Sequence, residues 1–187
     1  MSRTTRVVLM ALFTALIAVG AFLKIPLPVA PFTLQFLFTT MAGLLLGGKY
    51  GAACVLCYLC LGLMGLPVFA GGGGPGYVLE PTFGYLIGFC AGAWVTGRVA
   101  HGGARGFPPA LGRLLGANFL GLLVVYAFGM TYCWLISAFW LKQSLSLWTL
   151  FLYGFVLAVP GDAALCVLAA ALARRLLPVL QRKGWSA

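Results

Sequence analysis

Two carboxylates, Glu80 and Asp162, are the only acidic side chains among the 187 residues of this sequence. Asp162 follows Pro160 and Gly161 in the middle of a long apolar run, where a helix would be locally interrupted. A break of this kind frees backbone carbonyls, which favours a polar cavity over tight packing. The pattern therefore predicts that Asp162 contacts a ligand. A structural hydrogen bond to a neighbouring helix is the alternative.

Four consecutive glycines, Gly71 to Gly74, come shortly before Glu80. A phosphate-binding loop would need a following helix with a lysine and a hydroxyl in fixed register, and this segment has neither. Glycine permits close approach of the backbone to a ligand and large backbone rotations. The run is therefore either a flexible connector or a mobile lid over a cavity.

The remaining reactive side chains give little support for catalysis or metal binding. Cys54, Cys57 and Cys60 recur every third residue, but a metal site would need a fourth converging ligand, so buried apolar cysteines are expected. Glu80 and Asp162 could act as an acid–base pair in a membrane enzyme if both reached one substrate. Because the sequence shows no nucleophile–base set, we expect no enzymatic activity, metal or cofactor.

The composition indicates which elements hold these residues. Apolar residues make up 63% of the chain and charged residues 7%, whereas a soluble domain has about 25% charged residues. A helix of about 20 apolar residues crosses a bilayer. We expect an all-α integral membrane protein, a single membrane domain over residues 1–187 with six transmembrane helices. Their predicted ranges are 7–23, 33–47, 50–66, 81–99, 114–136 and 148–173. An aspartate at the bilayer centre costs about 2.5–3.5 kcal/mol, so Asp162 should face the bundle interior.

The basic residues predict the orientation. Of the 12 lysines and arginines, all except Lys24 and Lys142 fall on one side of the six predicted spans. By the positive-inside rule this side is cytoplasmic, and both termini lie there. The net charge of +10 is explained by this topology and by contact with the lipid bilayer, so no nucleic-acid partner is expected. The loops 24–33, 67–80 and 142–146 would face outward.

Several ordered strings along the chain resemble one family. They are IPLP at 25–28, PFTLQ at 31–35, AGLLLG at 42–47, GLMGLPVFAGG at 62–72, PTFGYLIGF at 81–89 and PGD at 160–162. Together they resemble the BioY family, the biotin-binding S-components of energy-coupling factor (ECF) vitamin transporters. The likeness covers essentially the whole chain.

The resemblance implies a six-helix, ECF S-component-like bundle in the plasma membrane of a prokaryote. Such a subunit captures a vitamin from outside and works with a transmembrane T-component and two ATP-binding subunits. Ala11, Ala15 and Ala18 resemble the small-residue face that these proteins present to the T-component. Small residues four apart allow close helix approach in lipid.

The resemblance also implies a binding site. Asp162 would bind the head of the ligand, while Tyr85 and the glycine loop, including Gly73 and Gly74, would shape and cover the pocket. The outer mouth of the second span carries two further polar candidates, Thr33 and Gln35.

The sequence departs from the family pattern at two positions. Family members usually carry a lysine three residues after the aspartate, where this chain has Leu165, and a small residue where it has Glu80. The pocket thus loses a cation and gains an anion, and Glu80 becomes a candidate for ligand contact. Lys24 is the alternative partner for a ligand carboxylate. Biotin is the expected ligand, and a related small molecule such as lipoate remains open.

Overall fold

A computed structural model of the protein describes residues 3–27, 30–102, 109–142 and 146–182. Within these residues the chain is mostly helical, as predicted. The helices are α1 (Arg3–Phe22), α2 (Gln35–Leu46), α3 (Gly48–Leu63), α4 (Phe83–His101), α5 (Leu111–Leu135), α6 (Leu147–Phe151) and α7 (Val159–Arg182). Two π-helical segments accompany them: η2 (Ile136–Trp140) extends α5, and η3 (Leu152–Val156) joins α6 to α7. The described helices thus follow the predicted order of six helical segments.

The spans differ in length. Among the described residues, three are long and apolar enough to cross a membrane: Arg3–Phe22 with 20 residues, Leu111–Trp140 with 30 and Trp148–Leu180 with 33. In contrast, α2 has 12 residues. A helix rises about 1.5 Å per residue, so α2 covers about 18 Å of a hydrocarbon core of about 30 Å. The predicted range 33–47 matches α2 to within two residues at each end, and α2 is shorter than the hydrocarbon core.

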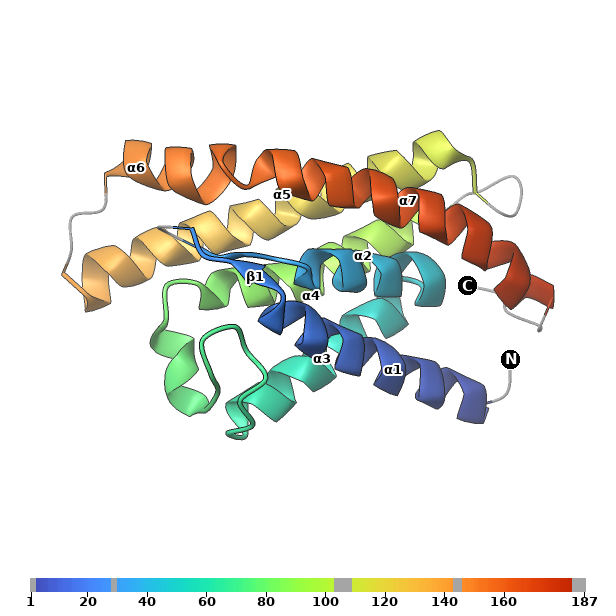
Figure 1. Cartoon of the computed structure of the whole chain (residues 1–187), viewed down its shortest axis with the longest axis horizontal. Coiled ribbons are helices and arrows are strands. Elements are labelled where there is room, and N and C mark those ends of the chain that lie inside the picture. The colour runs from blue at the N-terminus through green and yellow to red at the C-terminus, as the bar shows by residue number, and fades with distance from the viewer. Residues whose placement is uncertain (1–2, 28–29, 103–108, 143–145, 183–187) are drawn as a thin grey trace.

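A short hairpin explains why α2 begins late. β1 (Lys24–Ile25) and β2 (Phe32–Thr33) pair antiparallel, with Lys24 opposite Thr33. Extended backbone in these strands and the fixed ring geometry of Pro26 and Pro31 keep this segment out of a helix. Figure 1 shows the hairpin beside the start of α2. It occupies the place that one or two further helical turns would have filled.

The last two spans also differ from their predicted limits. α5 begins at Leu111, and the final span continues to Arg182, although the predicted ranges were 114–136 and 148–173. The prediction ended where Arg174 and Arg175 interrupt the apolar run. A helix can continue past such residues because their long side chains reach the polar interface while the stem stays on the apolar surface.

Glycines allow the central helices to lie close together. A Cβ on Gly43 of α2 would lie 2.5 Å from the backbone oxygen of Ala93 in α4, and a Cβ on Gly88 of α4 would lie 2.8 Å from that of Val125 in α5. Close backbone approach through small residues is a main source of helix association in lipid. A tight turn joins α2 to α3, with Gly47 at a φ of 81°.

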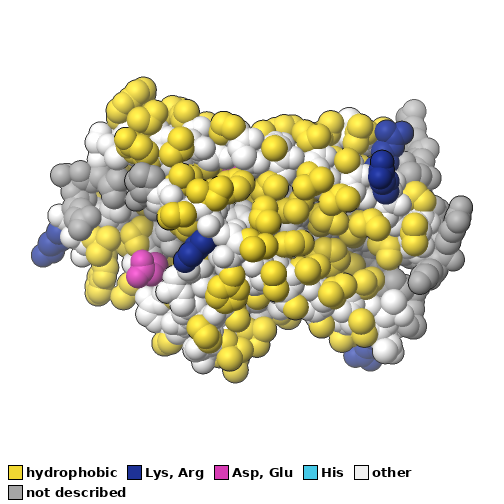
Figure 2. All heavy atoms as spheres, in the orientation of Figure 1, with side chains coloured by type: hydrophobic (Ala, Val, Ile, Leu, Met, Phe, Trp, Pro, Cys, Tyr) yellow, Lys and Arg dark blue, Asp and Glu magenta, His cyan; other side chains and the backbone are white. Residues whose placement is uncertain are grey.

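The arrangement of the ends agrees with an even number of spans. In Figure 1, α1 begins and α7 ends at the same end of the molecule, and α4 also ends there. Figure 2 shows that one face of the molecule is largely hydrophobic, with few charged side chains, most of them toward the two ends. An apolar surface of this kind is the one that lipid would cover. That the end with the termini is cytoplasmic stays a prediction from the positive-inside rule.

Candidate ligand-binding site

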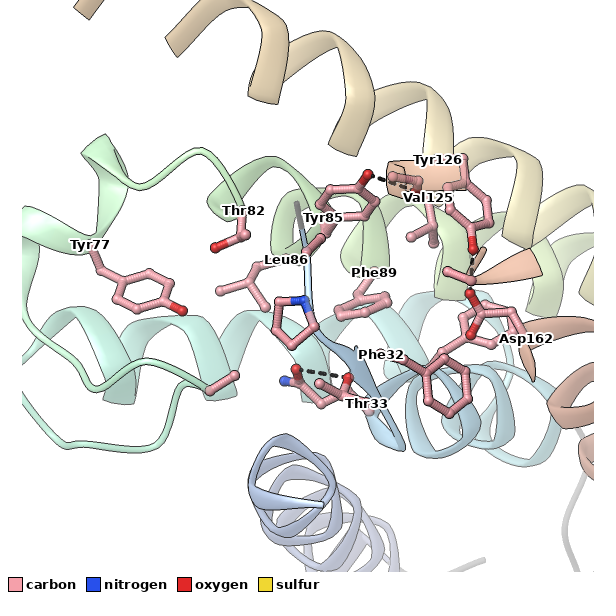
Figure 3. A pocket seen from close by; sticks show the side chains of 17 residues that line it. Phe32, Thr33, Tyr77, Thr82, Tyr85, Leu86, Phe89, Val125, Tyr126 and Asp162 are labelled. Carbon is pink, nitrogen blue, oxygen red and sulfur yellow. Dashed lines mark hydrogen bonds between the residues drawn. The ribbon is translucent and has the colours of Figure 1, made fainter. Parts of the chain in front are cut away.

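A cavity lies among the hairpin, the start of α2, α4, α5 and the last span (Figure 3). The space between the protein atoms here is about 670 Å³, part of which is open solvent. Aromatic, small and polar side chains line it: Ala30, Pro31, Phe32, Thr33, Gln35, Phe36, Ala70, Tyr77, Thr82, Tyr85, Leu86, Phe89, Val125, Tyr126, Gly154, Ala158 and Asp162.

Among the described residues that line the cavity, Asp162 is the only one with a charged side chain. It lies in the first turn of α7, just after η3 and Pro160, where the helix changes from π to α geometry. The hydroxyl of Tyr126 on α5 donates a hydrogen bond of 2.5 Å to Asp162 Oδ2. Within the described part of the chain, Oδ1 has no such partner, so it can accept hydrogen bonds from a ligand.

Aromatic rings form the wall next to this carboxylate. The ring of Tyr85 meets that of Tyr126 edge-on, with centroids 6.2 Å apart, and the Tyr85 hydroxyl donates to the backbone oxygen of Gly154 at 3.2 Å. On its other side, Tyr126 packs edge-on against Phe155 with centroids 4.9 Å apart. Apolar walls with a few placed polar groups are typical of sites that bind an amphipathic small molecule.

A chain of hydrogen bonds connects the cavity to the loop after α3. Thr33 Oγ1 lies 3.3 Å from Gln35 Oε1, and Gln35 Nε2 donates to the Tyr58 hydroxyl at 2.7 Å. Tyr58 in turn donates to the backbone oxygen of Val68 at 3.0 Å. Thr33, Gln35 and Tyr58 are all buried. The polar side chains at the start of α2 are therefore held in place by partners, and they also hold the loop.

The glycine loop folds back onto the end of α3. Phe69 is 1% exposed, packs edge-on against Tyr58 and exchanges two backbone hydrogen bonds with Gly72. The Gly74 N–H donates to the backbone oxygen of Gly62 at 2.7 Å, and the 3-10 helix η1 (Pro75–Leu79) follows. The loop is thus tied to the bundle by several contacts, and whether it moves as a lid stays a prediction.

The structure brings together some of the predicted site residues and leaves others outside. Asp162, Tyr85, Thr33 and Gln35 all line one cavity. Gly73, Gly74 and Glu80 do not line it, although the neighbouring Ala70 and Tyr77 do.

The alternative of a carboxylate pair is not supported. Glu80 is exposed and follows η1, whereas Asp162 lies in the cavity. Leu165 is buried in the apolar core, so no cation stands one helical turn after Asp162. Among the described residues, no group of three or more His, Cys, Asp or Glu side chains could hold a metal ion.

The sequence did not reveal several lining residues. Tyr126, Phe32, Phe89 and Tyr77 contribute to the cavity but were not predicted. For Tyr126 there was one weak indication in the sequence, because a hydroxyl within an apolar span needs a hydrogen-bond partner. The other three are aromatic residues in a chain that is 14% aromatic, and nothing in their spacing marks them.

The predicted partner face on α1 is open. Ala11 and Ala15 are exposed and Ala18 is half-buried, while Phe13 and Ile17 on the other side of the helix pack into the core. Nothing in the described residues covers Ala11 and Ala15, so this face is free to meet lipid or another helix.

The fold and the cavity define a class: a helical membrane-type protein with an aromatic cavity that one carboxylate lines. The particular family follows from comparison with known proteins. The sequence model of the BioY family matches residues 1–182, and the chain belongs to the BioY family.

Named relatives agree with this assignment. A protein of Lysinibacillus sphaericus named probable biotin transporter BioY is 46% identical over 178 residues, which cover 95% of this chain and 89% of that protein. A Rhizobium etli protein named biotin transporter BioY is 38% identical over 183 residues, covering 93% and 94%.

A solved structure shares the fold. The crystal structure of the S-component for biotin from an ECF-type ABC transporter superposes with a TM-score of 0.78 at 28% identity, covering 94% of each chain. The resemblance predicted from the sequence is confirmed. The family consists of transporter components, so the chain belongs with transporters and not with enzymes.

Proposed function

We propose that this chain is the substrate-binding S-component of an ECF-type importer and that it captures biotin from the outside. The observation that carries the proposal is the Asp162 carboxylate, which faces an aromatic cavity in a member of the BioY family. The ureido ring of biotin presents two N–H donors, and a carboxylate is a strong acceptor for them. The thioether ring is apolar and suits the aromatic walls.

The same geometry supports biotin over lipoate. Lipoate carries a carboxylate and a dithiolane ring, which has no N–H donor to offer Asp162. With lipoate bound, Asp162 Oδ1 would be removed from water without a partner, and such a loss is costly for a charged group. A pocket built around an acceptor therefore favours the ligand with matching donors.

Individual roles follow from the positions in the cavity. Tyr85, Thr33 and Gln35 would contact the ligand together with Asp162. Gly73 and Gly74 would act through the shape of the loop, which presents Ala70 and Tyr77 to the cavity. Glu80 is exposed and lies outside the proposed contacts.

The proposed assembly has further parts. A T-component and two ATP-binding subunits would supply the energy, in the plasma membrane of a prokaryote with both termini of this chain in the cytoplasm. The single membrane domain would dock on the T-component through the face of Ala11, Ala15 and Ala18, where small side chains allow close helix approach.

Substitution of Asp162 tests the proposal. In Asp162→Asn the amide oxygen can still accept from Tyr126, but the amide N–H₂ then points at the N–H groups of biotin. Calorimetric titration of the detergent-purified protein should show saturable biotin binding by the wild type. The variant should bind about tenfold to a hundredfold more weakly, the scale of a hydrogen bond to a charged group.

A thermal melt without ligand provides the control for folding. Because the amide is uncharged, it is less costly to place within a bilayer, and the variant should insert and fold. Equal affinity in a folded variant would make Asp162 a structural residue and would remove the main support for the proposed site.

A further inference from the structure

Lys24 lies at the edge of the cavity. In the hairpin it stands directly opposite Thr33, whose side chain lines the cavity. Directly opposed residues of an antiparallel pair have side chains on the same face. The Lys24 ammonium donates a hydrogen bond to the backbone oxygen of Ala70, and Ala70 is itself a lining residue. Lys24 therefore spans the gap between the hairpin and the glycine loop, next to the space that a ligand would enter.

The charges around the cavity leave a ligand carboxylate without a partner inside it. Asp162 is negative, and no cation is among the described residues that line the cavity. The carboxylate of biotin is at the end of a four-carbon chain, away from the ureido ring. If the ureido ring meets Asp162, this chain has to carry the carboxylate away from Asp162, toward the mouth formed by Ala70 and the hairpin.

The Lys24 ammonium has the capacity to bind that carboxylate. An ammonium has three N–H donors, and the contact with Ala70 uses one of them. Within the described residues, Lys24 pairs with no acidic side chain. A carboxylate would therefore meet free donors without displacing an existing ion pair, and the bond would be charge-assisted.

We infer that Lys24 binds the carboxylate of the ligand at the mouth of the cavity and makes the site selective for the acid over its neutral derivatives. The identification of the ligand as biotin rests on the proposed function. In this role Lys24 takes the place of the cation that is missing at Leu165. Its bond to Ala70 already joins the hairpin to the glycine loop, so a ligand carboxylate would be bound where these two segments meet.

The expected effect is moderate because Lys24 is exposed. Water screens an exposed ion pair, so the full strength of a buried charged hydrogen bond does not apply. We expect the wild type to prefer biotin over biotin amide, its uncharged derivative, by about tenfold. The preference should weaken as the salt concentration rises.

The test is a titration of wild-type protein and Lys24→Met with biotin and with biotin amide. The variant should lose about tenfold in biotin affinity and bind biotin amide as the wild type does, so the preference disappears. Lys24→Arg should keep most of the preference. Lys142→Met is the matched control, because it removes the other cation of the predicted outer side, which follows η2 and is not part of the hairpin.

The outcomes are separable. If Lys24→Met weakened the binding of biotin and of biotin amide equally, Lys24 would only tie the hairpin to the loop. If the preference for biotin stayed unchanged, the carboxylate would be bound elsewhere. Either result overturns the inference and leaves biotin binding intact. Failure of the wild type to bind biotin would overturn the proposed function, and the inference would fall with it.

Discussion

The hydroxyl of Tyr126 and the carboxylate of Asp162 come from different helices, and their contact is the most specific feature at the residue scale. The 2.5 Å bond fixes which oxygen of Asp162 is occupied and which is open to the cavity. Tyr126 is 4% exposed, so its hydroxyl has little access to water as a substitute partner. Tyr126 is thus a positioning residue for the proposed acceptor.

Removal of this hydroxyl should weaken ligand binding. In Tyr126→Phe the carboxylate loses the donor that holds it, and we expect biotin affinity to fall by about fivefold to tenfold, the scale of one hydrogen bond. Titration of the purified variant measures the effect. Tyr50→Phe is a matched control, because it removes a hydroxyl bonded to Arg6 at 2.5 Å that does not line the cavity. If both variants behaved alike, Tyr126 would have no positioning role.

At this scale the sequence predicted the polar side chains of the cavity better than the aromatic ones. Asp162 was predicted because a carboxylate within an apolar run is costly to place in a bilayer. Such a residue therefore indicates a ligand contact or a hydrogen bond inside the bundle. Thr33, Gln35 and Tyr85 were predicted from the family strings. Tyr126 was missed because its partner is 36 residues away, and the pairing depends on how α5 packs on α7.

At the scale of elements, the glycine loop is a folded segment whose shape depends on the absence of side chains. A Cβ on Gly73 would lie 2.1 Å from the backbone oxygen of Leu66, a distance that the backbone cannot accept. Gly74 has a φ of 105°, which side-chain-bearing residues rarely adopt. The loop can therefore present Ala70 and Tyr77 to the cavity only with glycine at these positions.

A single methyl group tests this account of the loop. Gly73→Ala should displace the loop and lower biotin affinity by about tenfold, with a loss of thermal stability of the size usual for a steric conflict. Gly76→Ala serves as the control, because nothing lies within 4 Å of a Cβ at that position. Titration and thermal melting of both variants compare the two sites. Equal, unchanged affinities would show that the loop does not shape the cavity.

The lengths of the elements were predicted less well than their order. Apolar composition predicted the order of the helical segments, but it could not show that residues 24–25 pair with residues 32–33 and that α2 begins only at Gln35. The prolines indicated that this segment is stiff, but they did not indicate where it lies relative to the helices. Residues of the hairpin and of the start of α2 line the cavity, so the least predictable element is also part of the candidate site.

At the scale of the whole molecule, the open face of α1 allows docking on the T-component and capture of biotin to be tested separately. Ala15→Leu adds bulk to an exposed position on α1, where close helix approach needs small side chains. We expect copurification with the T-component to be lost and biotin affinity to stay unchanged. Ala127→Leu adds the same bulk to an exposed position on α5 and should keep the complex. If Ala15→Leu kept the complex as well, docking through α1 would be contradicted.

The central claim is that the whole molecule is built to hold biotin by its ureido ring. Calorimetric titration of the purified wild-type chain with biotin and with lipoate tests it most directly. We predict one biotin bound per chain and an affinity for lipoate at least about a hundredfold lower, because a site built for hydrogen-bonding groups rejects a ligand that lacks them. Lipoate binding as tight as that of biotin, or no binding of biotin by folded protein, would contradict the account.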